Sequence, residues 1–138
     1  MSSAAIVLDA NILIRAVLGK RVRELIQAHA TTVKFFAPDV AYADARKYLP
    51  ALLTKRGVDP IPAMLVLDAL ERIVHPVDMD VYGGLQQQAL RRIEMRDADD
   101  WPVLACAMVL GCPVWTEDAD FFGNGDATWT TDRIARFL

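Results

Sequence analysis

Residues 97–122, DADDWPVLACAMVLGCPVWTEDADFF, carry five aspartates and one glutamate on either side of an apolar segment. The apolar residues after Asp100 recur at helical spacing and end at Gly111, which predicts a helix with an acidic N-terminus. Residues 112–115 are predicted to form a short buried strand, and a polar run follows its carboxyl end: Thr116, Glu117, Asp118 and Asp120. Ligands of open parallel α/β sheets bind beside the carboxyl ends of strands, so the two acidic groups are expected to meet there.

The N-terminal half contains a second acidic strand end. Residues 4–8, AAIVL, are continuously apolar and stop at Asp9, which is typical of a buried parallel strand. Helices are predicted over 11–18 and about 20–30, and a strand over 33–37. A long helix then opens at Pro38 and Asp39 and reaches about residue 56, before another helix that starts near residue 60. The inward face of that second helix is expected to be Met64, Leu65, Leu67 and Leu70.

The C-terminal half continues the alternation of strands and helices. A short strand is expected over 73–77 and a helix over 78–95, weakened by Gly83 and Gly84. A loop over 123–126, a strand over 127–130 and a terminal helical turn complete the chain. The alternation predicts a single domain over 1–138, a three-layer α/β/α sandwich with a mostly parallel central sheet of the Rossmann-like kind.

Composition narrows the function classes. The chain is 54% hydrophobic, with a mean hydropathy of +0.21, and no apolar run approaches the roughly 18 residues of a membrane span, so we expect a soluble protein. The first residues lack a basic signal region, and we therefore expect a cytoplasmic location. The two cysteines and two histidines lack metal-site spacing, so the cysteines are expected to be reduced and carboxylates must carry any chemistry. A net charge of −3 gives no broad attraction to nucleic acid, and the basic clusters are weak support for an RNA path.

The aspartates are expected to converge from several elements: Asp9, Asp44, Asp97, Asp99, Asp100, Asp118 and Asp120. Massed carboxylates repel one another and raise one another's pKa unless a cation neutralises them. Oxygen ligands select Mg²⁺ or Mn²⁺, which can activate water against a phosphodiester. Each acid also has a structural explanation, because Asp99 or Asp100 alone is more often a helix cap and Asp118 a solvent-facing loop residue.

Four motifs together resemble the PIN-domain nucleases, in particular the ribonuclease toxins of VapBC-type toxin–antitoxin pairs: VLDANILI, APDVAYADARKYL, RDADDWPVLACAMVLG and VWTEDADFF. The resemblance implies a Mg²⁺- or Mn²⁺-dependent endoribonuclease whose catalytic acids are Asp9, Asp44, Asp100 and Asp118. We expect the metal on Asp9, Asp100 and Asp118, with auxiliary roles for Asn11, Asp97, Thr116 and Asp120. The resemblance also implies an RNA substrate, a cognate antitoxin and a homodimer, with the helical hairpin at 38–72 as the partner surface.

The chain departs from the family pattern at three positions. Asp44 stands where the family usually has the longer glutamate, which leaves Asp39 as a rival for the second acid. Ala10 and Glu117 also replace polar or basic residues that are common in the family, but neither removes a ligand.

Three other functions remain as alternatives. A haloacid-dehalogenase-type phosphatase would need an aspartate at position 11, where this chain has Asn11, and a phosphoacceptor receiver domain would need a late lysine, whereas none follows Lys55. A metal-free PIN fold that only binds RNA or protein is the third alternative.

Overall fold

The computed structural model describes residues 4–93, 98–118 and 127–138, and within them a five-stranded, all-parallel sheet forms the centre of the molecule. Its strands are β1 (Ala4–Leu8), β2 (Val33–Pro38), β3 (Val74–Val77), β4 (Val114–Trp115) and β5 (Thr128–Trp129). Their spatial order is β3-β2-β1-β4-β5, so β1 lies between β2 and β4. The predicted fold class is confirmed, and the sheet is parallel throughout.

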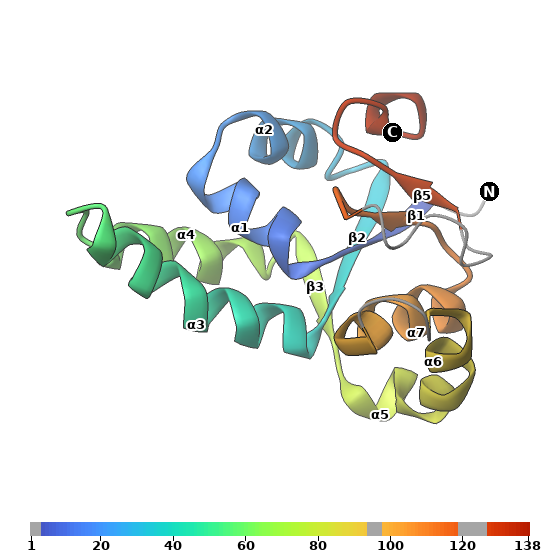
Figure 1. Ribbon diagram of the computed structural model, residues 1–138. Coiled ribbons are helices and arrows are strands. Elements are labelled where there is room, and N and C mark those ends of the chain that lie inside the picture. The colour runs from blue at the N-terminus through green and yellow to red at the C-terminus, as the bar shows by residue number, and fades with distance from the viewer. Residues whose placement is uncertain (1–3, 94–97, 119–126) are drawn as a thin grey trace.

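Helices cover both faces of the sheet (Figure 1). One face carries α1 (Ala10–Leu18), α2 (Arg21–Ala28), α3 (Asp39–Lys55) and α4 (Ile61–Leu70), and the other carries α5 (Met79–Tyr82), α6 (Gln86–Ile93) and α7 (Trp101–Leu110). Side chains of a strand alternate between faces, so Ile6 and Leu8 join the first core while Val7 joins the second. The continuous apolar composition of β1 follows from this burial on both sides.

The described residues also include three short 3₁₀ segments, of which two adjoin regular helices and one lies near the C-terminus. They are η1 (Gly83–Leu85), η2 (Ala98–Asp100) and η4 (Ile134–Arg136). The last of these is the expected terminal turn, shorter than the sequence suggested. The expected loop at 123–126 lies outside the described residues.

Proline and glycine set several element ends. Pro76 lies in β3, which is an edge strand, so its missing N–H costs no central ladder bond. Pro38 ends β2, and the Asp39 carboxylate accepts the Val40 N–H at 2.8 Å at the start of α3. Gly111 ends α7 with φ of +65°, in the left-handed region that favours glycine.

Two local predictions are wrong. The expected continuous helix over 78–95 is interrupted, because α5 ends at Tyr82 and η1, which contains Gly83 and Gly84, separates it from α6. Glycine weakens helix propensity, and the pair falls at this break. Leu65 was assigned to the inward face of α4 but is 63% exposed, while Leu67 and Leu70 are buried.

Two further features concern the cysteines and the length of the apolar helices. Cys106 and Cys112 are buried and form no disulfide, as expected, and burial raises the pKa of the Cys106 thiol to about 12. A helix long and apolar enough to traverse a bilayer is absent from the described part of the chain.

Candidate functional site

Asp9 lies where β1 turns into α1, and both of its carboxylate oxygens are held. Oδ1 accepts the Ile12 N–H at 2.9 Å, which caps the start of α1, and Oδ2 accepts the Thr116 hydroxyl. The residue is only 6% exposed. Since β1 and β4 are neighbours, the end of β4 brings Thr116 directly beside Asp9. Asp9 is therefore both a helix cap and the innermost acid of this sheet edge.

Burial raises the pKa of Asp9 from 3.8 to about 6. The hydrogen bonds from Thr116 and from the Ile12 N–H oppose that rise, whereas the charges of Asp118 and Glu117 add to it. Desolvation penalises the ionised form of a carboxyl group, and a nearby cation favours it. A cation next to Asp9 would therefore stabilise the ionised form of its carboxyl group.

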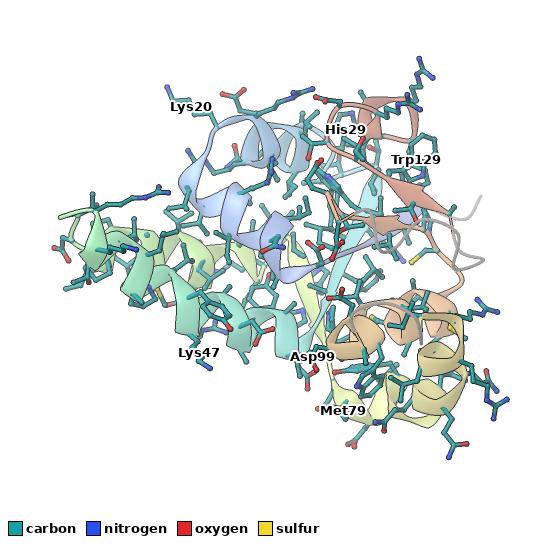
Figure 2. The ribbon with its side chains drawn as sticks, viewed as in Figure 1. Lys20, His29, Lys47, Met79, Asp99 and Trp129 are labelled. Atoms are coloured by element: carbon teal, nitrogen blue, oxygen red, sulfur yellow. The ribbon has the colours of Figure 1, made fainter. Side chains whose placement is uncertain are left out.

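A cavity of about 330 Å³ opens beside Asp9. Its polar lining comes from three directions: Asp9 and Asn11 at the start of α1, Asp44 and Tyr48 on α3, and Asp99 and Asp100 before α7. Figure 2 shows Asp99 beside the start of α7, on the side toward α3. Acids from both helical layers therefore meet at one end of the sheet.

The structure gives different surroundings to Asp44 and Asp39, the two candidates for the second acid. Asp44 lies on the face of α3 that lines the cavity, together with Ala41 and Tyr48. Asp39 is absent from that lining, and its carboxylate accepts the Tyr82 hydroxyl and the Met79 N–H at 3.2 Å. Geometry brings Asp44, and not Asp39, to the cavity.

Asp118 lies next to the cavity in a second hollow. The Asp118 N–H donates to Thr116 Oγ1 at 2.9 Å, and this hydroxyl in turn contacts Asp9. The second hollow shares Asn11 and Ile14 with the cavity. Asp97 and Asp120, the two auxiliary acids, lie outside the described residues.

Comparison with family models identifies the fold family. The model described as "PIN domain" matches residues 7–138, which is almost the whole chain. The chain belongs to the PIN domain family. Comparison with curated protein sequences finds no match.

Solved structures agree with a PIN domain. A chain from the structure of DNA-bound VapBC from Salmonella typhimurium aligns with a TM-score of 0.66 at 14% identity, covering 93% of this chain and 98% of that one. A chain of FitAcB from Neisseria gonorrhoeae aligns with a TM-score of 0.63 at 19% identity, covering 91% and 97%. A chain of VapBC-1 from nontypeable Haemophilus influenzae gives 0.62 at 15% identity, covering 94% and 99%. At these identities the likeness concerns the fold.

The donor set of this PIN domain fits a hard divalent cation, because the acids around the cavity offer only oxygen ligands. Asp100 begins α7, but its side chain makes no capping bond there, so helix capping does not account for it. Within residues 4–93, 98–118 and 127–138, no three acids, histidines or cysteines are already grouped as a metal site.

Two cavity residues were missed as site residues at the sequence level. Asp99 lines the cavity, whereas the sequence placed it among the converging acids without assigning it a role in the site. Tyr48 lies one helical turn after Asp44 on α3, so helical spacing from Asp44 was the available signal. Glu117 accepts the Thr131 N–H at 2.6 Å and lines the hollow that contains Asp118.

Proposed function

We propose that this PIN domain is a divalent-metal-dependent endoribonuclease that hydrolyses RNA phosphodiester bonds. In this proposal the catalytic acids are Asp9, Asp44, Asp100 and Asp118, and Mg²⁺ or Mn²⁺ is held by Asp9, Asp100 and Asp118. The observation that carries it is the buried Asp9 carboxyl, with its pKa raised to about 6, beside a cavity lined by acids from two further elements. A positive ion would relieve both the burial and the repulsion.

The residues around Asp9 have separate tasks in this proposal. Thr116 and the Ile12 N–H hold the two oxygens of Asp9, which fixes the orientation of its carboxylate. Asn11 lines both the cavity and the hollow that contains Asp118, and in this proposal its amide donates a hydrogen bond to a phosphate oxygen. The metal, when bound, supplies a water of lowered pKa and stabilises charge on the phosphate.

We also propose that the protein is the toxin of a toxin–antitoxin pair and a homodimer. The fold likeness to chains of VapBC and FitAcB supports this role. The hairpin of α3 and α4 exposes four large apolar side chains, which suit a partner surface: Tyr48, Val58, Ile61 and Leu65. An antitoxin on this surface could carry a basic side chain to the acids and so block the site.

Cleavage of a mixed-sequence single-stranded RNA in Mg²⁺, Mn²⁺ or EDTA tests the nuclease. We expect cleavage with either metal, none in EDTA, and a loss of at least about 100-fold in Asp9→Asn, the scale of losing an electrostatic stabiliser. Asp80→Asn, which changes an exposed acid on α5, is the matched control and should cleave normally.

Two outcomes would contradict the nuclease. RNA that is bound but left intact under all metal conditions would favour the binding-module alternative. Release of phosphate from monoesters without RNA cleavage would favour a phosphatase. The toxin role has its own test: expression should arrest growth, and co-expression of a small protein encoded directly upstream should relieve the arrest.

A further inference from the structure

A third hollow extends the site along α1. The hollow that contains Asp118 also contains Ile14, Arg15 and Glu117, and these three residues line a further hollow of about 400 Å³ where α1 meets α2. We call this the corner hollow. It is within the size range of small-ligand sites, about 300–1,000 Å³. Because lining residues are shared, the three hollows are neighbours along α1, and we call this row of hollows the path.

The path follows one face of α1. Asn11, Arg15 and Leu18 are spaced four and three residues apart, so they lie on the same side of the helix. Arg15 is four residues, or about 6 Å along the helix axis, from Asn11. Lys20 lines the far end of the path, and Figure 2 shows it at the outer corner between α1 and α2.

Some basic side chains of this region bind other groups of the protein, and others form no ion pair. Arg21 pairs with Asp132 at 2.8 Å, and Arg23 donates to the carbonyl oxygens of Ala16 and Val17 at the end of α1. Arg15 and Lys20, which are both exposed, form no ion pair with the residues that the structure describes. Their charges are therefore available to a ligand.

The lining has the mixed character of a nucleotide site. Ile14, Leu18 and Val22 supply apolar surface, on which a base can pack. Arg15 and Lys20 supply cations, and a guanidinium matches phosphate geometry with two parallel hydrogen bonds. Two acids also line the hollow, but Asp132 is paired with Arg21 and Glu117 accepts the Thr131 N–H.

We propose that the corner hollow binds the nucleotide of single-stranded RNA that flanks the cleaved bond. Arg15 contacts the phosphate next to the cleaved one, Lys20 contacts the phosphate beyond it, and the apolar residues of α1 and α2 support the base. This inference rests on the proposed function, because the acidic cavity defines where the cleaved phosphate lies. It explains how a chain of net charge −3 would hold a polyanion: local cations flank the acids.

Salt-dependent RNA binding tests the assignment. The probe is a fluorescein-labelled single-stranded RNA decamer, and the protein is metal-free in EDTA, so that no cleavage intervenes. Arg15→Gln should raise Kd five- to tenfold, through loss of a charge-assisted hydrogen bond. It should also reduce the magnitude of the slope of log Kd against log salt by about 0.7, the share of one phosphate contact in single-stranded nucleic acid. Lys20→Gln should lower the slope similarly.

Two control variants separate charge from structure. Arg92→Gln changes an exposed arginine on α6, on the other face of the sheet, and should leave Kd and slope unchanged. Arg15→Lys keeps the charge and should preserve the slope. Equal Kd and slope in wild type and Arg15→Gln would overturn the corner hollow as an RNA site while the nuclease proposal stands. A wild-type protein that neither binds nor cleaves RNA would overturn the proposed function, and this inference with it.

Discussion

At the scale of single residues, Asp9 combines a structural and a chemical role. A carboxylate at the start of a helix normally caps it, and Asp9 does so through the Ile12 N–H. A capping group on the surface would keep an ordinary pKa, whereas Asp9 is buried and its pKa is raised to about 6. Ionised Asp9 therefore lowers the free energy of unfolding of the metal-free protein, and this effect can be measured.

The pH dependence of stability follows from this pKa. The folded protein binds the Asp9 proton more tightly than the unfolded chain does, so stability falls as the pH rises from about 4 to about 6, and the penalty is complete above pH 6. Acidification from pH 7 toward pH 4 removes that penalty. The penalty is at most about 3 kcal/mol for a shift of roughly two pKa units. Metal-free Asp9→Asn should then melt at or above the wild-type temperature at pH 7, with the gap closing as the pH falls toward 4. A variant that melts well below wild type at pH 7 would contradict this.

Substitutions of Asp44 and Asp39 should have opposite effects on cleavage and on stability. Asp44→Ala removes an exposed cavity acid, so we expect cleavage to be lost while the melting temperature stays within error. Asp39→Ala removes an acceptor of Tyr82, Met79 and Val40, so we expect a destabilisation of about 1–3 kcal/mol with cleavage retained. Cleavage assays and thermal melts of both variants decide this, and the reverse result would make Asp39 the second acid. Asp44→Glu tests whether the cavity accommodates the longer acid.

At the scale of elements, the hairpin of α3 and α4 is anchored on one side and open on the other. The Tyr42 hydroxyl donates to the Val74 carbonyl of β3, and Arg46 bridges to Asp68, at 3.3 Å, and to Glu71. These contacts hold the hairpin in place, while four of its large apolar side chains remain exposed: Tyr48, Val58, Ile61 and Leu65. Exposed large apolar side chains on an anchored hairpin suit association with a second chain.

An acidic residue introduced among the exposed apolar side chains of α4 should prevent dimer formation. We expect wild type to be a dimer in light scattering and Leu65→Glu or Ile61→Glu to be monomeric, because each places a carboxylate in the apolar contact. Val81→Glu, which changes a half-exposed valine on α5, is the matched control and should remain dimeric. A wild-type monomer, or a dimer that survives both hairpin variants, would contradict this use of the surface.

At the scale of the whole molecule, the acidic cavity joins the two helical layers. Asp44 comes from α3 on one face of the sheet, and Asp100 precedes α7 on the other, so the lining of the cavity crosses the sheet edge. A cation held by acids of both layers would stabilise the folded state as a unit, since the unfolded chain does not hold these acids together.

The metal should therefore raise the unfolding temperature. At a free concentration of about 100 times Kd, Mn²⁺ or Mg²⁺ should add about 2.7 kcal/mol to the free energy of unfolding. Thermal melts with metal and with EDTA measure this, and calorimetric titration gives the Kd. The shift should be small or absent in Asp9→Asn and Asp100→Asn and retained in Asp80→Asn. Identical shifts in all four proteins would place the ion elsewhere.

The sequence alone determined the features that depend on local chemistry. Buried parallel strands need apolar residues on both sides, so AAIVL indicated β1 and placed Asp9 at its end. Helical periodicity and Gly111 indicated α7, with acids before it and a strand after it. The fold class followed from this alternation of elements, and the resemblance of the acidic motifs pointed to the PIN domain family that the family model then confirmed.

Only the tertiary structure decided which side chains meet. Asp39 and Asp44 lie on the same helix, and the packing of α3 turns one toward Tyr82 and the other toward the cavity. Leu65 looked like a core residue because α4 is apolar on most sides, but its neighbours cover only part of that surface. The raised pKa of Asp9 needs the burial and the neighbouring charges that arise when β4 pairs with β1. Such properties depend on contacts between residues far apart in the chain, and local sequence patterns carry no record of those contacts.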